Sequence, residues 1–171
     1  VHDPETEGTT DLAVRASNQA IQRAGISPED LDLCIVATMT PDTPTPSVSN
    51  ATAARVGAGP IGSFDINAAC SGFVYALNPA SELMRSGAYR KVLLIGADCI
   101  TRHVDYSTFG RGSAILFGDA AGAFILSATQ DTQQGLIASA MHSDANRARH
   151  LYIPTRNRDF PEDHDTDPRR I

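Results

Sequence analysis

Short apolar runs that alternate with stretches of helical periodicity constrain the fold of this chain most strongly. A short, continuous apolar run is typical of a strand buried on both faces of a sheet. The expected strands are 33–37, 63–66, 92–96, 121–127 and 136–141. The expected helices are 9–24, 47–56 and 70–85. Helices and strands that alternate through short connections indicate an α/β fold with a mostly parallel, mixed sheet flanked by helices.

Length and charge narrow the class of protein. The 171 residues, 42% of them hydrophobic, are enough for one domain with its own core and without disulfides or a structural metal. A formal net charge of -6 argues against a general nucleic-acid-binding surface. Neither a leader sequence nor an apolar run of the roughly 20 residues that cross a bilayer is visible. We therefore expect a soluble, cytoplasmic protein that binds no nucleic acid and no membrane, with ends that look cut rather than natural.

One glycine-rich string, 57–62, matches the dinucleotide-binding pattern Gly-x-Gly-x-x-Gly. That pattern works where a strand precedes it and a helix N-terminus follows it, so that backbone amides point at a pyrophosphate. Here the predicted order is reversed, because a helix precedes the string and a strand follows it. The match therefore does not indicate a nucleotide site.

Cys70 differs from the other two cysteines in its predicted position. It follows the strand at 63–66 through a tight turn and begins a helix. Unpaired amides and the helix dipole favour a thiolate there, which is the species that attacks a thioester carbonyl. The alternative is a structural cysteine buried as a small hydrophobe. Cys34 and Cys99 are expected in the core, and no cysteine has the spacing of a zinc site.

Four blocks of sequence together carry a resemblance to a known family. They are Ile35-Val36-Ala37-Thr38 with the proline loop after it, 65–77 around the cysteine, Leu94-Ile95-Gly96-Ala97-Asp98 with Arg102, and 111–122. The chain resembles the β-ketoacyl-acyl-carrier-protein synthase III enzymes of the thiolase superfamily, from near residue 5 to about 154. This resemblance implies a thiolase-like fold, layered αβαβα in the whole enzyme and assembled as a homodimer. Residues 5–142 would be its N-terminal half, which carries the nucleophile, and 143–171 an irregular loop excursion.

The resemblance also implies an activity, that of an acyltransferase that starts fatty-acid synthesis. Cys70 would accept an acyl group from acyl-coenzyme A, and malonyl-acyl-carrier protein would then lose carbon dioxide and attack the acyl-enzyme. Both are substrates, so no tightly bound cofactor and no metal is expected. By motif position, the implied substrate residues are Arg111 at the coenzyme A adenine, Gly112 and Leu116 along the pantetheine channel, Ile100 and Phe117 at the acyl pocket, and Thr45 across the dimer.

Part of the family's catalytic set is missing from this chain. The family uses a histidine and an asparagine from its second half, and none of the five histidines here fits that motif. Thr45 stands where an aromatic is common, which leaves the primer length open. Two other functions therefore stay possible: a related condensing enzyme of secondary metabolism that uses the same cysteine, or an incomplete, non-catalytic scaffold fragment.

Overall fold

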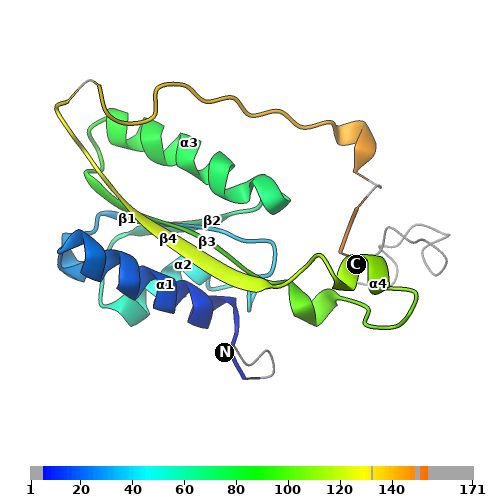
Figure 1. Cartoon of the computed structure of the whole chain (residues 1–171). Coiled ribbons are helices and arrows are strands. Elements are labelled where there is room, and N and C mark those ends of the chain that lie inside the picture. Colours follow the sequence, from blue (N-terminus) through cyan, green and yellow to red (C-terminus); the bar gives the residue numbers. More distant parts are fainter. Residues whose placement is uncertain (1–5, 132, 149–150, 154–171) are drawn as a thin grey trace. The chain divides into compact units, whose positions relative to one another are not determined.

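The computed structural model describes residues 6–131, 133–148 and 151–153. Helices and strands alternate through most of them (Figure 1). The main elements are α1 (Thr9–Ala24), β1 (Leu33–Ala37), α2 (Val48–Val56), β2 (Gly62–Ile66), α3 (Gly72–Arg85), β3 (Lys91–Cys99), α4 (Arg111–Ala114) and β4 (Asp119–Ser127). Short 3₁₀ helices are η1 (Pro28–Asp30), η2 (Ala69–Ser71), η3 (Ile100–His103) and η4 (Ala145–Arg147).

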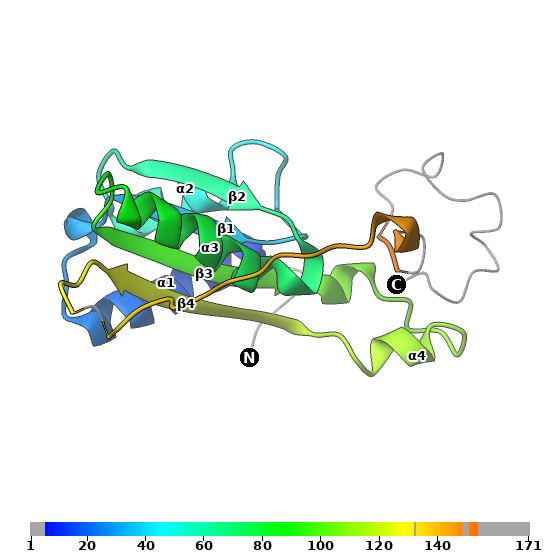
Figure 2. The same ribbon diagram turned by 90° about the horizontal axis from the view of Figure 1, so that it is seen from above.

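The four strands form one sheet in the order β2-β1-β3-β4, which Figure 2 shows from above. Strand β1 pairs in parallel with both β2 and β3, and β4 runs antiparallel to β3. The predicted mostly parallel, mixed sheet flanked by helices is thus confirmed. Strands β2 and β4 are the edges of this sheet within the described residues.

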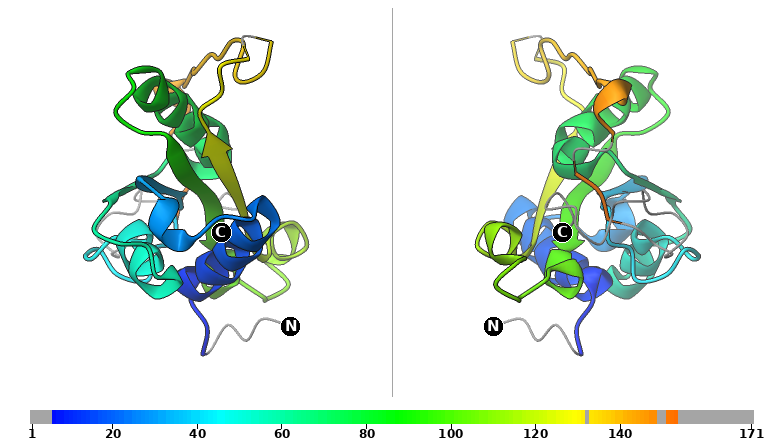
Figure 3. Two further views of the ribbon diagram at one scale, coloured as in Figure 1. Left: turned by 90° about the vertical axis from the view of Figure 1, so that its left-hand side faces the viewer. Right: turned by 90° about the vertical axis from the view of Figure 1, so that its right-hand side faces the viewer.

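Helices cover both faces of the sheet, as the end views show (Figure 3). Because successive side chains of a strand point to opposite faces, Val36 and Ile95 pack against α1 and α2, whereas Ile35 and Leu94 pack against α3. All five residues of β1 are buried. The continuous apolar runs of β1 and β3 thus reflect burial on two faces at once.

A carboxylate that is distant in sequence caps the start of α1. Asp42, in the proline loop, accepts hydrogen bonds from the backbone N–H groups of Thr9 and Thr10 at 2.9 and 2.7 Å. These are amides of the first turn of α1, which have no partner inside the helix. At their C-terminal ends, α1 and α2 finish at Gly25 and Gly57, whose φ angles of 64° and 84° suit glycine.

One predicted strand is wrong. Residues 136–141 form no strand, although the run is apolar. Side chains of α3 hold the segment instead. A guanidinium N–H of Arg85 donates to the Leu136 carbonyl at 2.7 Å, and the side-chain amide of Asn78 donates to the Ser139 hydroxyl. An apolar run bound to a helix in this way has no neighbouring strand with which to form a ladder.

The chain divides into two compact units. The first comprises 1–99 and 119–140 and holds the whole sheet with α1, α2 and α3. The second comprises 100–118 and 141–171 and holds α4 with η3 and η4. A boundary at residue 142 stays a prediction, and most of the predicted excursion, 154–171, lies outside the described residues. Among the helices that the structure describes, none has the length and apolar character that a membrane span requires.

Candidate active site at Cys70

Cys70 lies in η2, in the turn that joins the carboxyl end of β2 to α3. The turn reverses the chain sharply: Ala69 has a φ of +47°, a left-handed conformation that alanine rarely adopts. The Asn67 side-chain oxygen accepts a hydrogen bond from the Ala69 amide at 3.1 Å and supports this bend. The Cys70 side chain is exposed. Its exposure argues against the alternative of a small hydrophobe in the core.

The helix after Cys70 begins close to the sheet. It begins at Gly72 rather than at Cys70, because η2 forms the first turn. A Cβ on Gly72 would lie 3.2 Å from the Cβ of Ala37, a tight contact, so glycine favours this close approach of α3 to β1. Ser71, at the N-cap of α3, makes no side-chain capping hydrogen bond. The positive end of the helix dipole is therefore not capped by that residue, which suits a nearby thiolate or oxyanion.

The other two cysteines are buried, as predicted. Burial raises the pKa of Cys34 to about 12, and the negative charge of Asp65 adds to this effect. Cys99 is fully buried at the end of β3. Of the three thiols, only that of Cys70 is accessible to a substrate.

The remaining predicted site residues fall in both units. Thr45 is exposed in the proline loop of the first unit. In the second unit, Arg111 and Gly112 are exposed residues of α4, and the amides of Leu116 and Phe117 donate to the Ser113 carbonyl at 2.9 and 3.3 Å. Four of the predicted residues thus lie in α4 or in the turn that follows it. Ile100, 7% exposed, begins η3 of the same unit.

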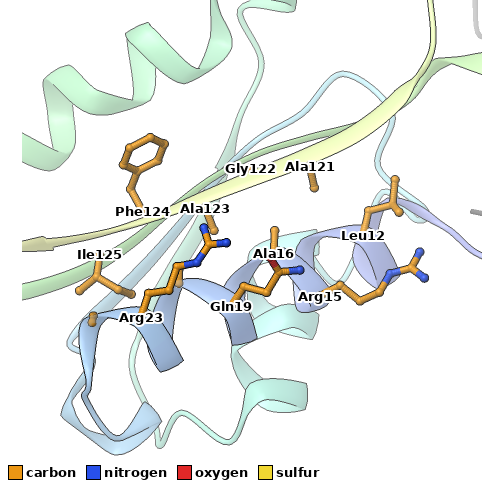
Figure 4. Close-up of a pocket in the computed structure, with 12 residues that line it drawn as sticks. Leu12, Arg15, Ala16, Gln19, Arg23, Ala121, Gly122, Ala123, Phe124 and Ile125 are labelled. Atoms are coloured by element: carbon orange, nitrogen blue, oxygen red, sulfur yellow. The ribbon is translucent and has the colours of Figure 1, made fainter. Parts of the chain in front are cut away.

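A glycine-rich string and a groove also lie beside the sheet. The glycine string 57–62 runs from the end of α2 to the start of β2, which confirms that it lacks the context of a nucleotide site. A groove of about 820 Å³ lies between α1 and β4, and Figure 4 shows Arg15, Arg23 and Phe124 among its lining residues. None of the predicted site residues lines this groove. Among the described residues, no cluster of side chains could hold a metal ion.

Sequence reasoning missed a hydrogen-bonded group next to the Cys70 turn. Thr38 and Thr40, after β1, bond the carboxylate of Asp98 near the end of β3. The available signal was positional: polar residues at the carboxyl ends of two buried parallel strands lie at the same edge of a sheet, where sites in α/β folds are found.

Comparisons with known proteins agree with this fold. The family model described as 3-Oxoacyl-[acyl-carrier-protein (ACP)] synthase III matches residues 64–145, which include Cys70. A β-ketoacyl-[acyl-carrier-protein] synthase III of Xylella fastidiosa (strain Temecula1 / ATCC 700964) is 45% identical over 150 residues, covering 88% of this chain and 45% of that protein. The Staphylococcus aureus (strain Newman) protein of the same name is 44% identical over 149 residues, covering 87% and 47%.

Solved structures lead to the same family. The 3-oxoacyl-(acyl carrier protein) synthase III of Pseudomonas aeruginosa PAO1 superposes with a TM-score of 0.84 at 35% identity, over 92% of this chain and 49% of that one. The priming β-ketosynthase of the R1128 polyketide pathway superposes with a TM-score of 0.70 at 36% identity, over 75% and 38%. The chain spans about half the length of the curated relatives it matches. By sequence and by its thiolase-like fold, the chain belongs to the β-ketoacyl-acyl-carrier-protein synthase III family, as a partial, N-terminal region of its members.

Proposed function

We propose that Cys70 takes an acyl group from acyl-coenzyme A, as the first half-reaction of a condensing enzyme that starts fatty-acid synthesis. The thiolate of Cys70 attacks the thioester carbonyl, the coenzyme A thiolate leaves, and a new thioester joins the acyl group to the protein. The observation that supports this most directly is an exposed thiol in a sharp strand-to-helix turn, next to a helix start that Ser71 does not cap. Membership of the family supplies the substrate class.

Intact-protein mass spectrometry after incubation with acetyl-coenzyme A tests the proposal. We expect the mass of one acetyl group to be added, and hydroxylamine, which cleaves thioesters, to remove it. Cys70→Ser should stay unmodified, whereas Cys34→Ala, which removes a buried thiol, should still be acylated. A folded wild-type chain that takes up no acyl group would contradict the proposal.

The condensation with malonyl-acyl-carrier protein is assigned to the complete protein. The histidine and asparagine that the family uses are not matched in this chain, so it should accept an acyl group without forming a β-ketoacyl product. For the coenzyme A moiety we propose Arg111, Gly112 and Leu116, and for the acyl chain Ile100, Phe117 and Thr45. Arg111→Ala should raise the acyl-coenzyme A concentration for half-maximal acylation while leaving the maximal rate within about twofold, since it removes uniform binding.

Self-association is part of this proposal. Among the strands that the structure describes, β2, which leads to Cys70, pairs with β1 alone. Its outer edge is therefore a surface that a second copy can bond through backbone groups. Phe64 on this strand is 37% exposed. Light scattering should show a homodimer of the complete protein, and Phe64→Lys should weaken it. A monomeric complete protein would refute this part of the proposal alone.

A non-catalytic scaffold is the second candidate function, and one observation favours it. Large apolar side chains are exposed over α3 and β4, with Val74 at 61% and Phe124 at 56%. Surfaces of this kind are normally covered in a complete protein. If the chain acts only as a scaffold, it should associate with a covering polypeptide while Cys70 stays unacylated by acetyl-coenzyme A. Acylation of the isolated chain would exclude a purely structural role.

A condensing enzyme of secondary metabolism is a variant of the first function. The structural likeness to the R1128 priming ketosynthase favours it. Competition between acetyl-coenzyme A and longer acyl-coenzyme A primers for Cys70 distinguishes the two, because Thr45 in place of an aromatic side chain leaves more room for a long primer.

A further inference from the structure

Asp98, near the end of β3, gathers three hydrogen bonds on one carboxylate oxygen. Its Oδ1 atom accepts from the Met39 amide at 2.8 Å, from the Thr38 hydroxyl at 3.1 Å and from the Thr40 hydroxyl at 3.2 Å. All three donors lie just after β1, where the β1–β3 ladder has ended at Ala37. Hydrogen bonds to a charged acceptor are stronger than those between neutral groups. The carboxylate thus continues the connection between the two strands beyond their backbone pairing.

The hydroxyl groups of the two threonines also accept hydrogen bonds from backbone amides. The Thr38 hydroxyl accepts from the Thr40 amide at 3.1 Å, and the Thr40 hydroxyl accepts from the Cys99 amide at 2.8 Å. Both threonine side chains are buried. Each hydroxyl therefore accepts from one amide and lies within hydrogen-bond distance of Asp98. The Thr40 hydroxyl also lies 3.2 Å from the Thr9 hydroxyl, so the segment after β1 has little freedom.

This segment supports the Cys70 turn on both sides. The Thr38 amide donates to the Ile66 carbonyl at 3.1 Å, at the point where β2 gives way to the turn. Ala37, next to Thr38, is the residue against which Gly72 packs where the turn becomes α3. Residues 37 and 38 thus lie under the first and last residues of the turn that presents Cys70.

We propose that Asp98 is a positioning residue for Cys70, acting through the segment after β1 that it holds in place. Its effect on acylation rests on the proposed function, whereas its effect on the turn does not. The carboxylate acts through the segment after β1 and so sets where the thiol is held, without taking part in the reaction itself.

Asp32 provides a matched control at the other end of the same strands. Its Oδ2 atom accepts from the Arg90 and Lys91 amides at 2.7 and 2.9 Å, and so connects the start of β1 with the start of β3. Asp32 joins the same two strands far from Cys70, so replacing it should weaken the sheet without moving the Cys70 turn. Comparing the Asp32 and Asp98 variants therefore distinguishes a loss of sheet stability from a loss of positioning.

Hydrogen exchange of residues 66–72, measured by mass spectrometry on this chain, tests the positioning. Asp98→Ala should speed exchange in this segment on the order of tenfold, the size expected from losing hydrogen bonds to a charged group. Asp32→Ala should speed exchange near 32 and 90–91 and leave 66–72 within about twofold of wild type. Equal effects of the two variants on 66–72, or no effect of Asp98→Ala, would overturn the proposal. Asp98→Asn keeps an acceptor oxygen and should be intermediate, which decides the matter if the alanine variant does not fold.

Acylation kinetics test the consequence for the chemistry. Asp98→Ala should lower the maximal rate of acyl transfer to Cys70 on the order of tenfold, without changing the acetyl-coenzyme A concentration for half-maximal rate, since positioning affects the reaction step. Asp98→Asn should recover part of that rate, and Asp32→Ala should retain it. A wild-type chain that is not acylated would sink the proposed function, and hydrogen exchange would still decide the role of Asp98.

Discussion

The Oδ1 atom of Asp65 accepts a hydrogen bond of 2.8 Å from the amide of Ser49, a residue sixteen positions earlier in the chain. Its Oδ2 atom accepts from the Val48 amide at 2.8 Å, so one carboxylate in β2 satisfies the first two amides of α2. Only five positions separate Asp65 from Cys70 along the chain. The strand that leads to the nucleophile and the helix beside it are thus fixed to each other by a charged group.

Replacing Asp65 should destabilise the fold. Asp65→Ala removes the cap and leaves two amides of α2 without their partner, so we expect a loss of about 1–2 kcal/mol in the free energy of unfolding. Urea denaturation followed by circular dichroism measures it. Asp131→Ala is the control, because within the described part of the chain that exposed carboxylate bonds its own turn, at Gln133 and Gln134. A loss of equal size in both variants would show that Asp65 does not act as a cap.

The buried thiol of Cys34 should make the fold sensitive to alkali. Its pKa is raised from 9.0 to about 12, chiefly by burial, so the folded chain keeps this proton where the unfolded chain has released it. The associated stability is complete below pH 9 and falls as the pH rises towards 12. The difference in unfolding free energy between wild type and Cys34→Ala should therefore shrink above pH 9. A difference independent of pH from 8 to 10.5 would contradict the assignment.

Asp11 should contribute stability with the opposite pH dependence. A hydrogen bond from the Gly8 backbone lowers the pKa of its carboxyl group, and an ion pair with Arg55 at 2.8 Å adds to this, against the effect of burial. Because the folded-state pKa lies below the ordinary 3.8, the stability is present above that pH and is lost as the pH falls through the lowered value.

The test of Asp11 is a comparison of unfolding free energies at neutral and acid pH. Asp11→Asn should be less stable than wild type at pH 7, and the two should converge in strong acid. Glu82→Gln is the control: Glu82 pairs with Arg85 on an exposed helix surface, where an ion pair contributes little. Divergence of Asp11→Asn from wild type at low pH would mean that the sign is wrong.

A side chain at position 72 should destabilise the fold. In Gly72→Val the new Cβ would lie 3.2 Å from the Ala37 Cβ, so α3 would have to move away from β1. Overpacking of this kind costs about 1–3 kcal/mol. Thermal unfolding should show the loss, whereas Gly112→Val, also in a helix but with no atom within 4 Å of its new Cβ, should unfold within a few degrees of wild type. Wild-type stability of Gly72→Val would show that the contact is not tight.

Local patterns were enough to predict most of the secondary structure. The run at 33–37 matches β1, and the helix at 9–24 matches α1 with Gly25 after it. These predictions hold because burial and helix ends depend on residues close together in sequence. The run at 136–141 is as apolar as a strand but is bonded by Arg85 and Asn78, so its state depends on a distant helix.

For the site, the sequence by itself determined that Cys70 stands where a strand turns into a helix, because strand and helix differ in periodicity; that this strand is a partly exposed edge strand came only from the structure. Only the tertiary structure decided which groups hold that turn. Asp98 acts on Met39 across 59 positions, and Asp65 on Ser49 across 16. No local pattern encodes such pairs, since parallel strands bring their ends together only after the crossovers between them have folded.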